Sequence, residues 1–188
     1  MNKLTKGQKL QLAYRQHFEP YAEHFQIAVT LTLKQYAKIT VKRFENYGED
    51  CYSYMHKLDD ERLQSTCRYF NKLLESAFYG NLCKNKNKRN WAQPLIITAV
   101  EGRNNNKHTH LHLAIGNIPK DCLDSSRNII TNAWTKCDFA NKQIHITDIT
   151  HTSGWLSYIT KEVGYTDNNA FEICSSVIPQ CIQTSICT

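Results

Sequence analysis

The sequence predicts an α+β fold: an antiparallel β-sheet with helices packed on one face, in two layers. Strand-like and helix-like segments follow one another in the order strand, helix, two strands, helix, strand, helix. The two consecutive strands are joined by a short turn rich in Gly and Asn, which indicates an antiparallel hairpin. The chain has 188 residues, 41% of them hydrophobic, which suits one domain with a real core. We expect the apolar strand faces to lie under the helices and the polar face to stay open.

The N-terminal part predicts a helical extension over residues 1–24, followed by a strand. The helical pattern is broken by Pro20, so one or two short helical segments are expected. Over residues 25–34, large apolar side chains alternate with small or polar ones: Ile27, Val29, Leu31 and Leu33 against Ala28, Thr30 and Thr32. This alternation predicts a strand with one apolar face and one small, polar face.

A long helix is predicted from Asp59 to Gly80. Acidic residues stand at its start, and apolar or Cys positions recur at helical spacing: Leu63, Cys67, Phe70, Leu74 and Ala77. The loop after it contains four basic residues and no acid: Lys84, Lys86, Lys88 and Arg89. Lys and Arg also outnumber Asp and Glu in the whole chain, by 23 to 17, so this loop suits a polyanionic partner such as DNA.

The second half of the chain predicts three more strands and two helices. Strands are expected over residues 94–102, 107–116 and 142–150, and helices over residues 119–137 and 153–164, the last with Ser153 as its N-cap. Residues 167–188 form a Cys-rich tail to which we assign no role. The eight Cys of the chain include no C-x-x-C pair, and a domain of this size does not need disulfides, so we expect reduced thiols.

The stretch KHTHLHLAIG, residues 107–116, places three histidines on one face of a strand. His108, His110 and His112 occupy alternate positions, and the opposite face is apolar, with Leu111, Leu113 and Ile115. A lone histidine on a strand needs no special role, but three in this register are unusual. Neutral imidazole is the commonest metal ligand, and side chains two apart on a strand point the same way. We therefore expect this face to bind a metal ion.

A tyrosine and a lysine lie one turn apart on the last predicted helix. Its core stripe is formed by three apolar residues: Leu156, Ile159 and Val163. Tyr158 and Lys161 fall on the opposite side, with Tyr165 beyond them. A phenol is a poor nucleophile at neutral pH, but a nearby ammonium favours phenolate, and a divalent cation polarises a phosphate. Together with the His strand, the pair fits phosphodiester chemistry.

In these motifs the chain resembles the HUH endonucleases, especially the single-tyrosine Rep proteins that start rolling-circle replication of plasmids, phages and small viruses. Three stretches match in order: AVTLTLK (Ala28–Lys34) looks like the first Rep motif, THLHLAI (Thr109–Ile115) like the His-hydrophobic-His motif, and SYITK (Ser157–Lys161) like the Tyr-x-x-Lys motif. The resemblance assigns residues 25–166 to an HUH endonuclease domain. It implies an HUH/RRM-like two-layer sandwich with the His motif on a central strand.

The resemblance also implies a metal site. His110, His112 and Glu101 would hold Mg²⁺ or Mn²⁺, and His108 is an alternative third ligand, because relaxases of the same superfamily use three histidines. By strand parity Glu101 groups with Ile97 and Ala99, so a twist or bend at the strand end would be needed to turn it toward the metal. The tyrosine follows the histidines in this chain, an order that favours Rep-like or transposase-like relatives over relaxases.

For the reaction, the resemblance implies a metal-dependent nickase and strand transferase acting on single-stranded DNA. Tyr158 would attack the scissile phosphate, leaving a 5′-phosphotyrosine and a free 3′-OH, and Lys161 would steady the phenolate or the phosphate. Thr30 and Thr32 would line the floor under the DNA. With one tyrosine in the motif, a second cut would require another subunit or another nucleophile.

The expected partner is a single-stranded DNA origin, which could include a hairpin. The sequence has no P-loop motif GxxxxGK[ST], so a host helicase would have to unwind the DNA before a host polymerase copies it. No apolar run approaches the length that spans a bilayer, and no signal peptide is recognisable, so we expect a cytoplasmic protein without a membrane partner.

Four other functions fit parts of the pattern. Within the same chemistry, the chain could be a single-tyrosine transposase acting on hairpin ends or a nickase that cuts a competitor's replicon. Outside enzymes, it could be a binding module that binds origin DNA without cutting it, with a His cluster that binds no metal or binds Zn²⁺. An RNA-binding protein ranks last, because the aromatic residues that stack on bases in RNA-recognition folds are missing from the central strands.

Overall fold

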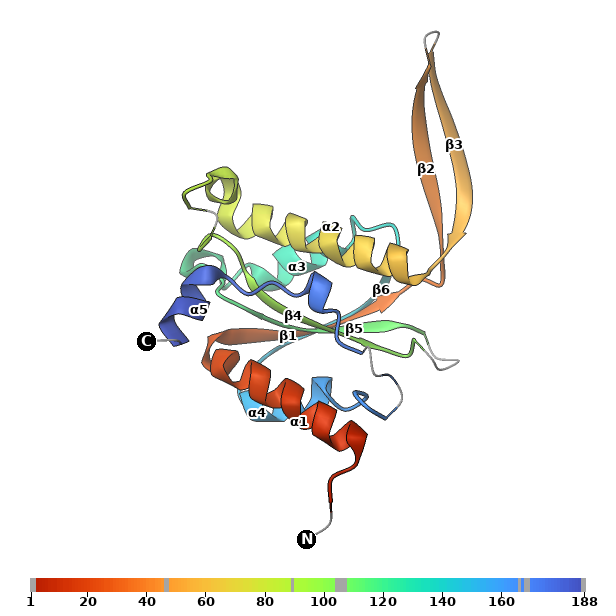
Figure 1. Ribbon diagram of the computed structural model, residues 1–188. Coiled ribbons are helices and arrows are strands. Elements are labelled where there is room, and N and C mark those ends of the chain that lie inside the picture. The colour runs from red at the N-terminus through yellow and green to blue at the C-terminus, as the bar shows by residue number, and fades with distance from the viewer. Residues whose placement is uncertain are drawn as a thin grey trace.

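The computed structural model describes residues 3–45, 48–88, 90–103, 108–165, 167 and 170–186. A four-stranded antiparallel sheet with the strand order β4-β5-β1-β6 lies at its centre (Figure 1). The strands run over Leu95–Glu101 (β4), His110–Gly116 (β5), Phe25–Leu33 (β1) and Ala140–Asp148 (β6). Helices accompany the sheet, so the predicted α+β class is confirmed. Strand β5, which carries the histidines, is an inner strand.

The chain enters β1 through two helical segments separated at the proline. Helix α1 spans Lys6–Phe18, and the Thr5 hydroxyl at its start accepts a hydrogen bond from the Gln8 amide at 3.2 Å in a capping box. The 3₁₀-helix η1 spans Glu19–His24, with Pro20 in its first turn, where a missing N–H does no harm. The prediction of two short helical segments is confirmed.

Helix α2, which spans Asp60–Tyr79, has the boundaries that its sequence predicts. The Asp59 side chain accepts a hydrogen bond from the Arg62 amide at 2.9 Å, and Gly80, with a φ of 54°, ends the helix in a conformation that favours glycine. Among the described residues, no helix is long and apolar enough to cross a membrane.

Two helices pack on the predicted apolar face of the sheet. Residues 119–137 form a 3₁₀ turn, Lys120–Cys122 (η3), and then helix α3 over Ser126–Trp134, rather than one continuous helix. Phe70 of α2 and Trp134 of α3 meet edge to face, with ring centroids 5.5 Å apart. We call the buried group around them the first cluster; its strand members include Val29, Leu31, Leu33, Leu111, Leu113 and Ile115.

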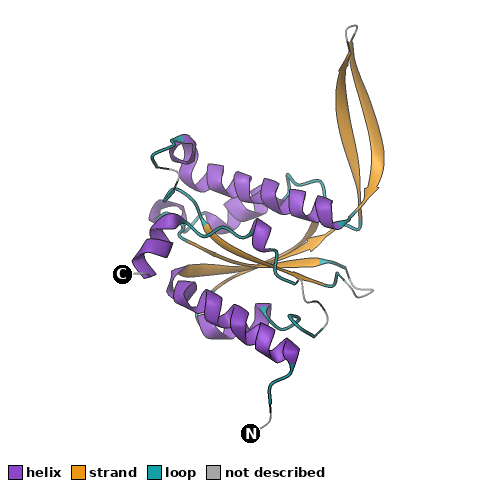
Figure 2. Cartoon of the chain, viewed as in Figure 1, coloured by secondary structure: helices purple, strands orange, loops and turns teal. Residues whose placement is uncertain are grey.

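The opposite face of the sheet is also covered by helices (Figure 2). Helix α4, which spans Thr152–Ile159, packs there near α1, and its N-cap is His151 rather than the predicted Ser153. The second cluster joins the predicted stripe of α4 to apolar residues of β4 and β5: Leu156, Ile159, Val163, Ile97, Ala99 and Ala114. The expectation of helices on one face only is wrong, because small residues such as Ala let a helix approach this face closely.

A long hairpin absent from the predicted elements extends from the body of the protein (Figure 1). Strand β2 spans Tyr36–Glu45 and pairs antiparallel with β3, Gly48–Lys57, in a two-stranded sheet of their own. The pairing continues at the base, where the Leu58 amide donates to the Gln35 carbonyl at 2.8 Å. We call this hairpin the arm.

The C-terminal segment closes the outer edge of β4. It contains the 3₁₀ turn Ile173–Ser175 (η4) and helix α5, Gln180–Ile186. Isolated bridges join Val177 to Ile96 and Phe171 to Ala99, so backbone groups of β4 that would otherwise face solvent are paired. Residues of the predicted tail are therefore part of the packed structure.

Candidate active site

The strand register brings the predicted metal ligands to one face of the sheet. His112 pairs with Ala99 of β4 and Thr30 of β1, while His110 pairs with Glu101. Paired residues of antiparallel strands point to the same side. Glu101 therefore shares a face with both histidines without any twist. The parity argument misjudged it because Ile97 and Ala99, its companions on β4, are buried by helices on this same face.

Glu101 is the centre of the site. Its Oε2 atom lies 2.6 Å from Nε2 of His112 and 2.8 Å from Nζ of Lys161. Burial raises the pKa of this carboxyl, but hydrogen bonds from Lys161 and His112 outweigh burial and hold the pKa below its usual value. The carboxylate is therefore ionised at neutral pH and accepts both hydrogen bonds.

His112 is 4% exposed, and both of its ring nitrogens are engaged. Nε2 donates to the Glu101 carboxylate, which can only accept, so Nδ1, 3.0 Å from Oγ1 of Thr30, accepts from that hydroxyl. Burial lowers the pKa of the imidazole, although Glu101 acts to raise it. The ring is therefore neutral at pH 7 in a defined tautomer.

Tyr158 and Lys161 lie together beside this pair, as predicted. Helix α4 ends at Ile159, and the turn after it places Nζ of Lys161 4.1 Å from the centroid of the Tyr158 ring. Burial acts to lower the pKa of Lys161, but hydrogen bonds to Glu101 and Tyr158 raise it above its usual value. The ammonium is therefore charged, and the Tyr158 side chain, in a residue 41% exposed, stays accessible from solvent.

Trp155 is a site residue that the sequence analysis missed. Its ring stacks on that of Tyr158, with centroids 5.1 Å apart and an interplanar angle of 24°, and Tyr158 also meets the His112 ring edge to face at 5.2 Å. The signal was present, because Trp155 lies three positions before Tyr158 on the same helix. The two aromatic residues line a surface groove of about 360 Å³ together with Ala28, Thr147, Asp148, Ile149, Thr150, His151 and Gly154.

Of the two remaining histidines of the motif, His110 shares the face of the sheet with Glu101, with which it pairs across the strands. His110 is half-buried, and His108 is exposed just before β5. Among the described residues, no three His, Cys, Asp or Glu side chains are positioned to hold a metal ion. The donor chemistry of Glu101 and His112 nevertheless fits Mg²⁺ or Mn²⁺, since the carboxylate is ionised and the imidazole neutral. Binding would require them to exchange their mutual hydrogen bond for coordination.

The predicted DNA-contacting residues are only partly gathered at the site. Thr30 contacts His112, whereas Thr32 is 4% exposed, which does not fit a place on an open floor under DNA. Lys84, Lys86 and Lys88 are exposed, but they follow the C-terminal end of α2, a helix of 20 residues and thus about 30 Å long. The N-terminal end of that helix is the one near the site, through Asp60 and Arg103. Arg89 lies outside the described residues.

Arg103, two residues after Glu101, forms ion pairs that hold the turn after β4 in place beside the site. Its guanidinium pairs with Asp60 at the start of α2, at 3.2 Å, and with Glu172 of the C-terminal segment. Asp167 lies 4.0 Å away. Glu172 and Asp167 are both buried. The turn after β4 is therefore tied to three parts of the chain that lie far apart in sequence.

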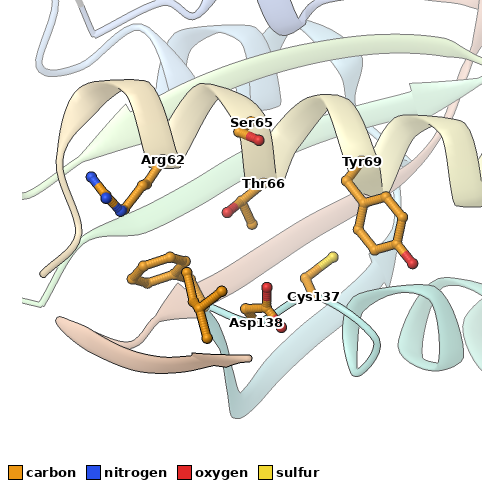
Figure 3. A pocket seen from close by; sticks show the side chains of 8 residues that line it. Arg62, Ser65, Thr66, Tyr69, Cys137 and Asp138 are labelled. Carbon is orange, nitrogen blue, oxygen red and sulfur yellow. The ribbon is translucent and has the colours of Figure 1, made fainter. Parts of the chain in front are cut away.

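A second cavity lies on the other face of the sheet, between α2 and the segment before β6 (Figure 3). It encloses about 150 Å³, and Arg62, Thr66 and Asp138 are among its polar lining residues. Cys137 also lines it, but burial raises the pKa of this thiol to about 12, so the thiol is neutral at physiological pH. This cavity borders the first cluster and is separate from the Tyr158 site.

No protein-family model, curated protein sequence or solved structure matches the chain.

Proposed function

We propose that the protein is a metal-dependent nickase and strand transferase for single-stranded DNA, with Tyr158 as its nucleophile. One observation carries the proposal: a single carboxylate, Glu101, contacts both His112 and Lys161, and the Tyr158 ring packs against both of these partners. One residue of the His motif and two of the Tyr-x-x-Lys motif thus meet at a carboxylate of the neighbouring strand β4. If Tyr158 and Lys161 were only polar residues on the surface of the protein, nothing would require them to contact a histidine and a carboxylate of β5 and β4.

Tyr158 is suited to form a covalent phosphotyrosine. Its oxygen would attack the phosphorus, the bond from phosphorus to the 3′-oxygen would break, and the phenolic proton would pass through solvent to the leaving oxygen, giving a 3′-OH. The Lys161 ammonium, held close to the ring by Glu101, would stabilise the phenolate as it forms.

The proposed metal ligands are His110, His112 and Glu101, with His108 as the alternative third ligand. Bound Mg²⁺ or Mn²⁺ would polarise the scissile phosphate and so reduce the nucleophilicity required of a phenol. With the metal ion at Nε2, the His112 ring would carry its proton on Nδ1 and donate it to the Thr30 hydroxyl, which would fix the orientation of the ring as outer partners of metal-binding histidines do.

The groove beside Tyr158 is the proposed path of the DNA strand next to the cut. It is formed by β1, by the end of β6 and by α4, and Trp155 offers it an aromatic ring. Unpaired bases stack on aromatic rings whatever their sequence, whereas paired bases are not available to do so. This favours a single strand as the substrate.

We infer initiation of rolling-circle replication of a plasmid, phage or mobile element as the biological role, with a host helicase and polymerase as partners. A single-tyrosine transposase or a nickase directed at a competing replicon would use the same site. The three roles differ in the DNA sequence that is cut, so the native target distinguishes them.

The test is a covalent adduct. The protein is incubated with pooled single-stranded oligonucleotides and Mn²⁺ or EDTA, and the products are analysed on a denaturing gel and by peptide mass spectrometry. We expect a Mn²⁺-dependent nucleotide adduct on Tyr158, absent from Tyr158→Phe and present in the matched control Tyr165→Phe, whose tyrosine is exposed and lies beyond Lys161. An adduct that persists in Tyr158→Phe would overturn the assignment of the nucleophile.

A second candidate is a DNA-binding module that does not cut. It is favoured by the closed hydrogen bond between Glu101 and His112 and by the lack of a three-residue metal cluster among the described residues. This function predicts DNA binding that is indifferent to Mn²⁺ and to Tyr158→Phe, with no adduct on the native target.

A further inference from the structure

The arm has the composition of a surface that meets a polyanion. Residues 34–41 and 52–58, which form its base and middle, contain three Lys residues and no Asp or Glu. Lys42 and Arg43 lie further out, with Arg43 opposite Asp50. The three acidic residues of the arm lie at its tip: Glu45, Glu49 and Asp50. The cationic part therefore lies next to the body of the protein.

At the base of the arm, one of its faces is turned toward the body, whereas Tyr52 and Tyr54 further along the same face are exposed. Ala37 is buried and Ile39 is partly buried against the first cluster, while His56, opposite Ala37, lies 2.6 Å from the Arg62 guanidinium of α2. Ile39 and Arg62 both line the cavity of Figure 3. These contacts fix the direction in which the arm leaves the sheet.

The other face of the arm is exposed. By register, Tyr36 pairs with Lys57 and Lys38 with Met55, and alternation places these four with Thr40 and Ser53 on one side. We call these six residues the outer face. All six are exposed, with Tyr36 at 56% and Met55 at 62%, and the Thr40 and Ser53 hydroxyls are 2.8 Å apart.

We propose that the outer face of the arm binds single-stranded nucleic acid. It combines two ammonium groups with an exposed aromatic ring and an exposed, polarisable thioether side chain, and none of its six residues is acidic. Cations that track a phosphate backbone beside rings on which bases stack are the features of single-strand binding. The proposal does not depend on cleavage by Tyr158, because it concerns a different surface.

The experiment measures binding without chemistry. Fluorescence anisotropy with a labelled 30-nucleotide oligo-dT, in EDTA and over a range of salt concentrations, compares the full chain with two double variants. One is Tyr36→Ala with Met55→Ala, and the other is Lys38→Ala with Lys57→Ala. The matched controls are Tyr165→Ala and Lys142→Ala, whose side chains are exposed outside the arm. Circular dichroism melting curves verify that each variant is folded.

We expect the Tyr36/Met55 variant to bind about five-fold or more weakly, because a stacking platform is lost. The Lys38/Lys57 variant should reduce the slope of log K against log salt by about 1.4, since about 0.7 is lost for each cation on a single strand. The two control variants should bind as the unaltered chain does.

Three results would overturn the proposal. Affinity within two-fold of the unaltered chain in both double variants would show that the arm makes no contact. Equal losses on a 30-base-pair duplex would show that paired DNA is the ligand. Dimers in sedimentation that the double variants abolish, with DNA binding unchanged, would assign the outer face to a second copy of the chain. Absence of a Tyr158 adduct affects only the nickase proposal.

Discussion

Oε2 of Glu101 accepts a hydrogen bond from Nε2 of His112 at 2.6 Å, joining the end of one strand to the middle of the next. Their register would place Glu101 opposite His110, so the carboxylate reaches diagonally to His112. In this state the acid and the imidazole that are proposed to hold a metal ion satisfy one another. Metal binding must therefore compete with this hydrogen bond and with the ion pair to Lys161.

Replacing Glu101 by Gln should lower the pKa of His112 further. The carboxylate acts to raise that pKa against the effect of burial, and a neutral amide removes most of this influence. Imidazole resonances in two-dimensional NMR, followed through a pH titration of the metal-free protein, measure the change. The exposed His145 lies on β6, the strand on the other side of β1 from His112, and serves as the internal control whose resonances should not differ between the two proteins. A His112 pKa that rises in Glu101→Gln would contradict the hydrogen-bond assignment.

Acidification should destabilise the metal-free protein in two successive windows. The folded pKa of His112 lies below its usual value of 6.5, so the unfolded chain binds its proton first, and stability falls as the pH drops from about 6.5 toward the folded pKa. The folded pKa of Glu101 lies below 4.5, so its contribution is present above that pH and is lost below it. Urea unfolding in EDTA at a series of pH values from about 7.5 down to about 3, a range that brackets the usual pKa values of His and Glu, measures both windows. In His112→Gln, the free energy of unfolding should change less with pH in the first window. If it changes as much as in the unaltered protein, His112 is excluded as the source of that window.

Substituting Met for Arg103 should lower the free energy of unfolding by about 3 kcal/mol or more, because the buried Glu172 carboxylate loses its partner. Chemical denaturation measures the loss. Adding Glu172→Gln to this variant should restore part of the stability, because the uncompensated charge is then removed. A loss below about 1 kcal/mol in Arg103→Met would show that the ion pair behaves like an ordinary surface pair.

Replacing Phe171 by Ala should also destabilise the fold, by about 3 kcal/mol. The Phe171 ring is 5% exposed and stacks on Tyr14 of α1 at 4.6 Å, so its loss leaves a cavity between the C-terminal segment and the body. Urea denaturation of Phe171→Ala is compared with Ile173→Ala, a matched control two residues away that is 62% exposed. If Phe171→Ala lowers the free energy of unfolding as little as an exposed-site substitution does, the C-terminal segment contributes little to the stability of the packed structure.

Much of the sheet could be predicted from the sequence because its strands have one strongly apolar face. Val29 and Leu31 alternate with Ala28 and Thr30, a pattern that only a strand explains, and the structure has β1 over Phe25–Leu33. Helix α2 could be predicted because its acidic start and its glycine end agree with its apolar spacing. The meeting of Tyr158 and Lys161 could be predicted from their spacing of three residues, although α4 ends at Ile159 and Lys161 lies in the turn that follows.

The arm and the second layer of helices could not be predicted in the same way. Most of the arm's described side chains, those of residues 36–40 and 52–57, are exposed. Tyr and Lys therefore occupy positions where a half-buried strand would have apolar residues, and the alternation signal is weak. On β4, Ile97 and Ala99 are buried on the face opposite to Ile96 and Val100, so apolar character no longer identifies a single inner face. The position of Glu101 was misjudged for this reason. Long-range partners such as Glu172 leave no local pattern at all.

The tie between Arg103 and Glu172 has a consequence for how the protein is made. Arg103 follows Glu101 by two residues, but its buried partner is 69 positions further along the chain. A chain emerging from the ribosome can pair β4 with β5 and dock α2 well before residue 172 has been synthesised. The turn beside Glu101 gains its final anchorage only when the C-terminal segment arrives and closes the edge of β4. The candidate site is thus among the last regions of the nascent chain to reach its finished form.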